Sequence, residues 1–420
     1  MSNAASASLR SGEARLALGR PGVLFRLSAV ASAFAVGLVV VSAVLELGTT
    51  HWGIALVALP LLVANVVLAR LAYSASTRLT ILALASFLVA IALGGVVAWS
   101  GDATWASALH VGAAAIALGV ALVVVAGAVR GEAVPLASGR DYLTLTKPRI
   151  MTLLLLTGAA GMFVGAQGVP PLGLFGVTML GLGLACGGAS ALNHVLDRDI
   201  DALMGSRTEK RPVATGRVSP EQALEFGVLL SAISFALLAS AVNVLTAVLA
   251  LVGNLFYVLV YTHWLKRSTP HNIVIGGAAG AVPPLVGYAA AIGSLALPAL
   301  WLFLIVFLWT PPHFWALALM IKNAYAAAGV PMLPVVRGDR ETARQIVLYS
   351  LVMVAFTVVV GLWLGPLYTV AAVVLGAVFI VLALLLRRDL SRTRAQVLFH
   401  YSLLYLALLF TAAALDPVLL

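Results

Sequence analysis

Long apolar runs, each of about 18 residues or more, recur along almost the whole of this 420-residue chain. A helix of that length crosses a hydrocarbon core about 30 Å thick. Hydrophobic residues make up 62% of the sequence and charged residues only 10%, so a single soluble core could not bury the apolar side chains. The pattern predicts an all-α polytopic membrane protein with about thirteen transmembrane helices.

The positive charges predict how the chain is oriented in the bilayer. Lysine and arginine together number 25 and give a formal net charge of +10. With a cytoplasmic N-terminus, all of them fall in the N-terminal tail, in inward-facing loops or at the inner ends of spans, as the positive-inside rule requires. We therefore expect a multi-pass protein of the cell (inner) membrane with its C-terminus outside. The same distribution explains the positive charge as an interaction with the lipid bilayer, and it argues against a nucleic-acid partner.

Composition divides the chain into three expected parts. Residues 1–22 are small, polar and basic, which predicts a disordered tail. Residues 23–138 predict a membrane block of four charge-poor spans, with His51 and His110 towards the outer face. Histidine is a common haem ligand, so the pair could hold haem or dock a partner; two interfacial histidines with ordinary hydrogen bonds are the plainer alternative. Residues 139–420 predict a second domain, which carries the polar motifs.

Carboxylates gather in the stretch NHVLDRDIDALM, residues 193–204. Asn193, Asp197 and Asp201 recur every fourth residue, so on a continuous helix they share one face. Asp199 points to the other side. An amide and two carboxylates supply the hard oxygen donors that suit Mg²⁺ beside a substrate phosphate. The alternative is a solvated charged loop between two spans.

Basic and polar side chains recur on the same predicted side of the membrane. Arginine forks grip diphosphate oxygens, and lysine supplies a compact positive charge. The candidates for such contacts are Lys147, Arg149, Arg207, Arg211, Tyr261, Lys266, Arg267 and Asn272. Lys147 and Arg149 flank Pro148 at the start of a span, where lipid-facing anchors are an equally good interpretation.

One ionisable residue lies deep in a predicted span. His313, in the segment WTPPHFWALAL, is about seven residues from the inner end, or about 10 Å deep at about 1.5 Å per residue. That depth predicts a functional group facing the bundle interior, and a structural histidine bonded to a carbonyl is the alternative. The apolar loop that follows contains Lys322 and Tyr325.

Five segments in order resemble the intramembrane UbiA-type prenyltransferases, and among them the branch that farnesylates haem. They are TKPR, NHVLDRDIDALM with RTEKRP, YTHWLKRSTPHNIVIGGAAGAVPP, TPPHFWALAL and AAGVPMLPVVRG. The resemblance covers roughly residues 140–415 and implies a bundle of nine transmembrane helices. It also implies that the chain transfers a farnesyl group from farnesyl diphosphate to a vinyl group of haem b, with addition of water.

The same resemblance implies roles for individual residues. Asn193, Asp197 and Asp201 would bind Mg²⁺ and farnesyl diphosphate, and Lys266 would support the diphosphate with Arg207 and Arg211. His313 and Trp315 are the expected porphyrin contacts, and Lys322 and Tyr325 the expected contacts in the later loop. That loop departs from the family pattern, because Asn323 and Ala324 stand where the family carries an acidic pair. A second carboxylate metal site is therefore not expected.

Three alternatives remain open on the sequence. A related prenyltransferase would modify an aromatic or quinone acceptor in place of haem. A transporter would also place polar residues inside the bundle, but it would more often show internal repeats, which this sequence does not show. A non-catalytic membrane protein that hands haem onward would need no intact acidic stripe. The first four spans also resemble one four-helix half of haem A synthase in span count, in the stretch ARLAYSASTRLT and in a histidine, which adds haem A synthase as a candidate partner.

Overall fold

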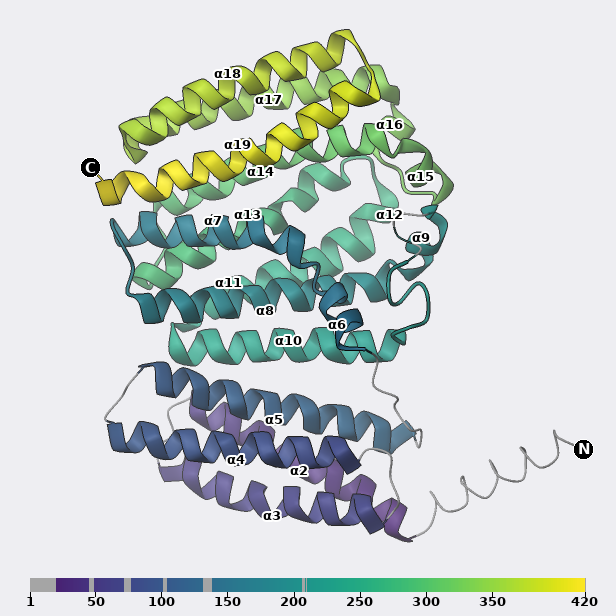
Figure 1. The fold of residues 1–420 in the computed structure, drawn as a ribbon, viewed down its shortest axis with the longest axis vertical. Coiled ribbons are helices and arrows are strands. Elements are labelled where there is room, and N and C mark those ends of the chain that lie inside the picture. The colour runs from purple at the N-terminus through teal and green to yellow at the C-terminus, as the bar shows by residue number, and fades with distance from the viewer. Residues whose placement is uncertain are drawn as a thin grey trace, which may run out of the picture. The chain divides into compact units, whose positions relative to one another are not determined.

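A computed structural model describes residues 20–44, 49–71, 77–100, 104–130, 138–205, 208 and 210–419. These residues form helices and connecting turns and contain no strand (Figure 1). Among them, twelve helices are long and apolar enough to cross a membrane, which confirms an all-α multi-pass membrane protein. The exact number of spans stays a prediction, because the expected fourth span contains only a shorter apolar stretch, His110–Val125. The orientation of the termini also stays a prediction.

The helices form two compact units, and each is described by itself. The first contains α2 (Arg20–Val44), α3 (Thr49–Leu71), α4 (Thr77–Ser100) and α5 (Thr104–Arg130). The second contains α6 (Gly139–Leu145), α7 (Pro148–Ala166), α8 (Leu172–Leu196), α9 (Arg198–Leu203), α10 (Pro220–Ala241), α11 (Val244–Leu255), the π-helix η2 (Phe256–Leu265), α12 (Lys266–Ser268), α13 (Asn272–Ile292), α14 (Leu297–Met320), α15 (Lys322–Ala327), α16 (Leu333–Val336), α17 (Gly338–Leu364), α18 (Pro366–Arg388) and α19 (Arg392–Leu419).

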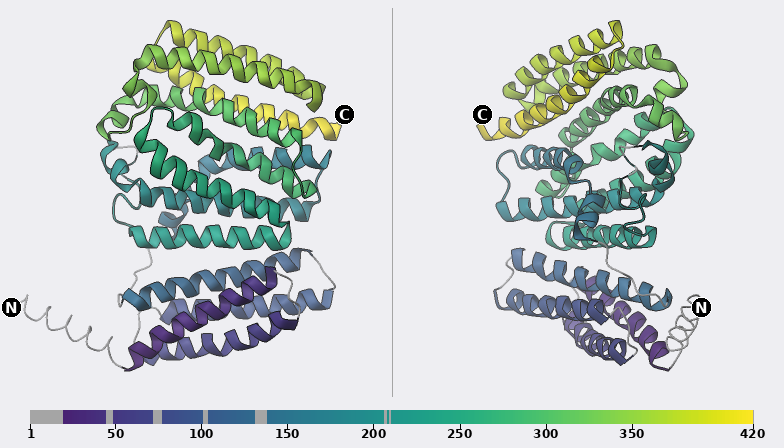
Figure 2. Two further views of the ribbon diagram at one scale, coloured as in Figure 1. Left: turned by 180° about the vertical axis from the view of Figure 1, so that it is seen from behind. Right: turned by 45° about the vertical axis from the view of Figure 1, so that its right-hand side comes forward.

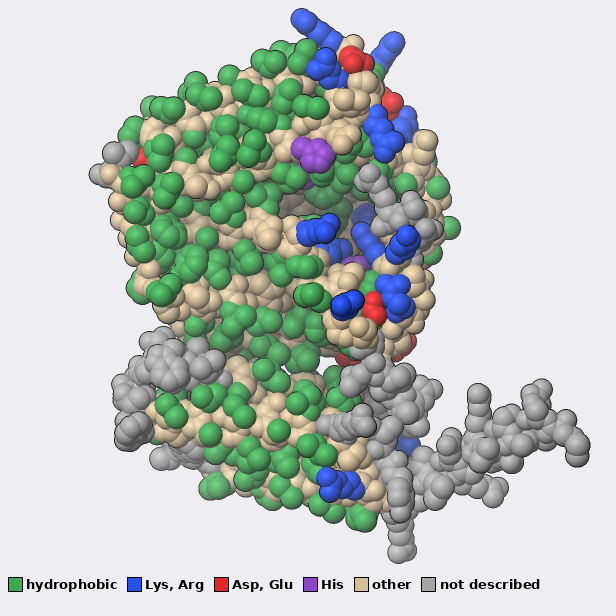
Figure 3. Space-filling view, in the orientation of Figure 1, with side chains coloured by type: hydrophobic (Ala, Val, Ile, Leu, Met, Phe, Trp, Pro, Cys, Tyr) green, Lys and Arg blue, Asp and Glu red, His purple; other side chains and the backbone are tan. Residues whose placement is uncertain are grey.

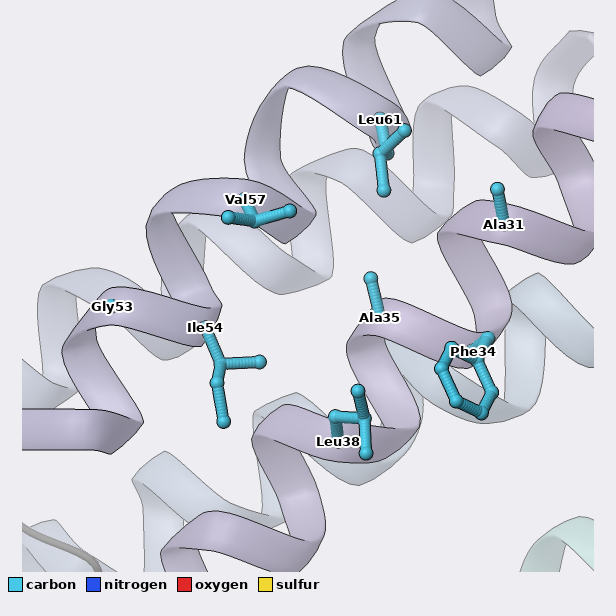
Figure 4. Close-up of a pocket in the computed structure, with 8 residues that line it drawn as sticks. All are labelled: Ala31, Phe34, Ala35, Leu38, Gly53, Ile54, Val57 and Leu61. Atoms are coloured by element: carbon cyan, nitrogen blue, oxygen red, sulfur yellow. The ribbon is translucent and has the colours of Figure 1, made fainter.

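The first unit is a small bundle with an apolar interior. Small and medium side chains such as Val36, Ala58 and Leu62 are almost completely buried between its helices, together with Phe87. On its surface, α2 and α3 leave a groove of about 590 Å³ (Figure 4). The groove is lined by Ala31, Phe34, Ala35, Leu38, Gly53, Ile54, Val57 and Leu61. Because its lining is apolar throughout, the groove offers nothing that would orient a polar ligand.

In the second unit, glycines let α7 and α13 pack closely. A Cβ atom on Gly287 would collide with the Gly158 carbonyl, and one on Gly161 would collide with the Pro284 carbonyl. Small residues at helix contacts are the usual device for close approach in membranes, where lipid is as apolar as the helix surface. The long helices run roughly alongside one another (Figure 2). The short helices α6, α9, α12 and α15 lie towards one side of the unit, and the C-terminal end of α19 lies on the opposite side (Figure 1).

Local sequence signals explain several helix ends. Ser219 and Gln222 form the reciprocal capping box that starts α10, with Pro220 in the first turn. Pro148 likewise starts α7, behind Lys147 in a left-handed conformation with φ 49°. The π-helix η2 was not expected from the sequence. Such segments are uncommon and often lie at functional sites, and η2 delivers Lys266 to the end of the bundle where the short helices lie.

Candidate functional site

The acidic stripe lies where α8 ends and α9 begins. Asn193 is in the last turn of α8, Asp197 joins the two helices and Asp201 is in α9. The expectation of one continuous helix is wrong at Asp197, whose φ and ψ are −91° and 4°. The four-residue spacing survives nevertheless, because the Asp197 N–H donates to the Asn193 carbonyl at 2.9 Å and the Asp201 N–H donates to the Asp197 carbonyl at 2.8 Å.

All three side chains of the stripe are buried, with 3%, 1% and 1% of Asn193, Asp197 and Asp201 exposed. The Asn193 amide N–H₂ donates to Asp197 Oδ2 at 2.8 Å and to the Thr262 hydroxyl at 3.1 Å. A buried carboxylate is costly unless it is paired and hydrogen-bonded. The alternative of a solvated charged loop is therefore excluded for Asp197 and Asp201.

Three basic residues contact this cluster, and two of them, Lys147 and Lys266, come from distant parts of the chain. Lys147 Nζ donates to Asn193 Oδ1 at 2.7 Å, and Lys266 Nζ donates to Asp197 Oδ2 at 2.5 Å. The Arg211 guanidinium contacts both oxygens of Asp201, at 2.7 and 2.9 Å. We call these residues, Lys147, Asn193, Asp197, Asp201, Arg211 and Lys266, the buried ionic cluster; Lys147 and Arg211 are partly buried, and the other four are buried.

Burial and neighbouring charges shift the pKa values of Lys147 and Asp201, which lie outside the spans. Burial of the ammonium group, reinforced by Arg211, lowers the pKa of Lys147 to about 7. Burial raises the pKa of Asp201 above its ordinary value, and the Arg211 guanidinium opposes that rise. The groups are thus held close enough to influence one another, as expected of an ion-binding site.

Oxygen donors of the cluster fit a hard divalent cation. Asp197 Oδ1 is buried and has no hydrogen-bond partner, so one carboxylate oxygen is available. The described residues contain no group of three or more His, Cys, Asp or Glu side chains placed to hold a metal. Mg²⁺ does not need such a cage, because it commonly takes one or two carboxylates and completes its shell with substrate phosphate and water. Asn193, Asp197 and Asp201 together offer that partial shell.

The short helices α9 and α15 pack together with the π-helix η2. Ile200 of α9, Tyr261 of η2 and Tyr325 of α15 belong to one buried apolar cluster. Tyr261 also stacks on Tyr257, with ring centroids 5.6 Å apart. Asn272, at the start of α13, is fully buried and neither polar atom of its side chain has a protein partner. These contacts bring three of the predicted substrate contacts, Tyr261, Asn272 and Tyr325, into the protein interior.

Other predicted substrate contacts lie outside the buried ionic cluster. Arg267 pairs with the exposed Asp199 at 2.7 Å, and that hydrogen bond lowers the pKa of Asp199 to about 2. Lys322 pairs with Asp339 at 2.9 Å. Arg149 is exposed, and Arg207 lies outside the described residues. Figure 3 shows that basic side chains gather around a hollow at this end of the second unit.

His313 lies in α14 against α19. Its Nδ1 is 2.6 Å from the Ser402 hydroxyl, and its ring is stacked between Trp309 and Phe399 at centroid distances of 4.3 and 4.7 Å. Trp315, two residues further on, turns to α17 and meets Tyr349 edge to face. The structure therefore does not bring His313 and Trp315 together, because residues two apart on a helix point about 200° from each other.

Several residues of the site escaped the sequence analysis. Thr262 and Ser402 are ordinary spanning residues until helix packing brings them to Asn193 and His313. His194, adjacent to Asn193, is 2% exposed and neither ring nitrogen has a protein partner. Tyr257 carried a usable signal, since it lies one helical turn before Tyr261. Thr262 and Ser402 have no feature in the local sequence that would have marked them as part of the site.

Comparison with known proteins gives three findings. The model of the UbiA prenyltransferase family matches residues 154–409. A protoheme IX farnesyltransferase from Symbiobacterium thermophilum is 57% identical over 282 residues, which are 66% of this chain and 94% of that protein. Another from Roseiflexus sp. is 54% identical over 282 residues. These residues are 66% of this chain and 52% of that relative, so the chain spans about half of that relative's length.

Two solved structures share the fold. A digeranylgeranylglyceryl phosphate synthase aligns with a TM-score of 0.56 at 17% identity, over 67% of this chain and 99% of its own. A UbiA homolog from Archaeoglobus fulgidus, bound to GPP and Mg²⁺, aligns with a TM-score of 0.51 at 19% identity, over 65% of this chain and 99% of its own. At these identities the likeness concerns the fold alone.

Proposed function

Because this chain belongs to the UbiA prenyltransferase family, we propose that it transfers the farnesyl group of farnesyl diphosphate to a vinyl group of haem b. Water is added in the reaction, and the products are haem O and diphosphate. The relatives named protoheme IX farnesyltransferase support haem as the acceptor. The buried ionic cluster supports a diphosphate as the leaving group. We place this reaction in the cell (inner) membrane.

The observation that carries the diphosphate assignment is the excess of basic groups at a buried site. Lys147, Lys266 and Arg211 face only two carboxylates, those of Asp197 and Asp201. A phosphate group can replace a carboxylate as the partner of lysine or arginine without loss of charge-assisted hydrogen bonds. The cluster can therefore accept a diphosphate by exchanging partners inside the protein.

Mg²⁺ fits the cluster at Asn193, Asp197 and Asp201, and when bound it would neutralise charge on the departing diphosphate. The chain's own residues bind and orient that group: Lys266 and Arg211 supply donors at the place where negative charge develops. The bond between farnesyl and diphosphate oxygen breaks, and the oxygen keeps the electron pair. The haem vinyl group then attacks the allylic cation, and water adds to the resulting cation with loss of a proton.

For the acceptor, His313 supplies the best-defined polar group deep in α14. Ser402 Oγ donates to the Phe399 carbonyl at 2.7 Å, so its single proton is used and it accepts from His313 Nδ1. This hydrogen bond leaves the lone pair of the neutral ring on Nε2, where it can contact the porphyrin or its iron. Haem A synthase, as the enzyme that would act on the product, stays a proposed partner.

Purified protein incubated with haem b, Mg²⁺ and prenyl diphosphates of several chain lengths tests this proposal. Mass spectrometry should find haem carrying one hydroxyethylfarnesyl chain, and the shorter and longer diphosphates should react less. Transfer to an aromatic or quinone acceptor with no reaction of haem would contradict it. The Asp197→Ala variant is the matched control, because it should show only the transfer that occurs without catalysis.

A further inference from the structure

Three hydrogen bonds join the α8 segment, in a constant register, to the segment formed by α11, η2 and α12. Each joins residues that are 69 positions apart in the sequence: Ala185 with Asn254, Asn193 with Thr262, and Asp197 with Lys266. A constant separation means that the two segments run side by side in the same direction. Tyr257 lies between the contacts at Asn254 and Thr262, and therefore deeper in the bundle than the acidic stripe.

Tyr257 shares a face of η2 with a residue that contacts the acidic stripe. Hydrogen bonds in a π-helix join residues five apart, so side chains about that far apart lie above one another. Thr262 contacts Asn193, and Tyr257 precedes Thr262 by five residues. The charges of Asp197 and Asp201 act on the Tyr257 side chain, which agrees with this placement.

The Tyr257 hydroxyl is available to a bound molecule. Its ring is half-buried and stacks on Tyr261, with centroids 5.6 Å apart and planes inclined by 25°. Throughout the described part of the chain, no residue forms a hydrogen bond with this hydroxyl. The cations of the buried ionic cluster, in contrast, are each hydrogen-bonded already, to Asn193, Asp197 or Asp201. A phenol hydroxyl donates one hydrogen bond, and in Tyr257 that donor is unused.

The position of Tyr257 matches one particular atom of the proposed substrate. With the diphosphate on the buried ionic cluster and the farnesyl chain directed into the apolar bundle, the oxygen that bridges carbon and phosphorus faces the deeper side. We propose that the Tyr257 hydroxyl donates a hydrogen bond to this bridging oxygen while the carbon–oxygen bond breaks. The oxygen keeps the electron pair, the farnesyl group becomes the allylic cation, and the proton stays on Tyr257.

This inference rests on the proposed function and deepens it by naming the donor at the leaving oxygen. Developing negative charge makes that oxygen a stronger acceptor in the transition state than in the ground state, so the hydrogen bond accelerates bond breaking rather than tightening binding. Tyr257 would then be a catalytic residue, because its hydroxyl touches a reacting atom.

Farnesyl diphosphate labelled with oxygen-18 at the bridging position tests the proposal without haem. Each time the carbon–oxygen bond breaks and forms again, the label moves to a non-bridging oxygen, and phosphorus NMR measures the rate. Tyr257→Phe keeps the ring and its stacking on Tyr261, so the variant should fold. It should slow both label exchange and single-turnover farnesyl transfer by about 10²–10³-fold, as loss of one donor to a developing oxyanion does in other enzymes.

Affinity for farnesyl diphosphate, measured by titration of the same full-length samples in detergent, should be unchanged in Tyr257→Phe. Tyr368→Phe is the matched control, because it also removes a hydroxyl without a hydrogen-bond partner, on α18, and it should leave rate and affinity at the wild-type values. Wild-type rates in Tyr257→Phe, or a loss of affinity as large as the loss of rate, would overturn the role of the hydroxyl. If wild-type protein exchanges the label but farnesylates no haem, the proposed acceptor is wrong, and slower exchange in Tyr257→Phe would still support the hydroxyl.

Discussion

At the scale of single residues, the site is defined by which carboxylates are buried. Asp197 and Asp201 are each 1% exposed and paired with basic groups, whereas the side chain of Asp199, between them in sequence, is 58% exposed. Surface ion pairs such as Asp199–Arg267 contribute little to stability, typically about 0–1 kcal/mol. Of the three aspartates within five residues, Asp197 and Asp201 therefore belong to the buried site, and Asp199 belongs to a surface ion pair.

This difference predicts the effect of alanine substitutions on turnover. Asp197→Ala and Asp201→Ala should each reduce farnesyl transfer to background, because each removes an oxygen donor of the proposed Mg²⁺ site. Asp199→Ala should retain most of the activity. Steady-state rates and the circular dichroism of the three purified variants check this expectation, and a larger loss in Asp199→Ala would mean that the wrong face of the motif has been assigned.

A second residue-scale prediction concerns His313. His313→Ala should impair the use of haem far more than the binding of farnesyl diphosphate. The reason is that the ring contacts Trp309, Phe399 and Ser402, whereas it has no hydrogen bond or ring contact with the buried ionic cluster. Ser402→Ala should raise the apparent KM for haem by a smaller factor, since the imidazole remains but loses the partner that orients it. Titration with farnesyl diphosphate in the absence of haem supplies the control, and an equal loss of that affinity would contradict a role at the porphyrin.

At the scale of elements, the contact between α7 and α13 carries the tightest constraint. Gly287→Ala should destabilise the second unit by about 1–3 kcal/mol or more, because the new methyl group meets the backbone of α7 rather than a movable side chain. Gly280→Ala in the same helix is the matched control, since its Cβ would have nothing within 4 Å. Thermal unfolding in detergent distinguishes the two, and similar midpoints would show that the helices can separate at little cost.

Helices and their ends could largely be predicted from sequence, and their mutual contacts could not. The length of the apolar runs predicted the membrane spans, and Ser219 with Gln222 predicted the start of a helix, because both signals are local. Lys266 and Asp197 are 69 residues apart, and His313 and Ser402 are 89 apart. Such pairs depend on how helices pack, which a single sequence does not specify. The π-helix η2 escaped prediction for the same reason, since packing can favour a widened turn that has no composition of its own.

At the scale of the whole molecule, the two units have separate interiors, and the acidic motifs lie only in the second. We therefore predict that protein lacking residues 1–138 still farnesylates haem at a rate close to that of the full chain. Product analysis by mass, on truncated protein whose helical content and unfolding temperature have been checked, tests this. A folded but inactive truncated protein would make the first unit part of the catalytic machinery.

The paired charges of the buried ionic cluster have a consequence for the enzyme when it is idle. Each carboxylate has its own cation within 3 Å while no substrate is present, so no large uncompensated negative charge is left in a region of low dielectric constant. The protein can therefore be inserted and persist in the bilayer through periods when substrate is scarce. Its abundance in the membrane should follow its synthesis and not the supply of farnesyl diphosphate.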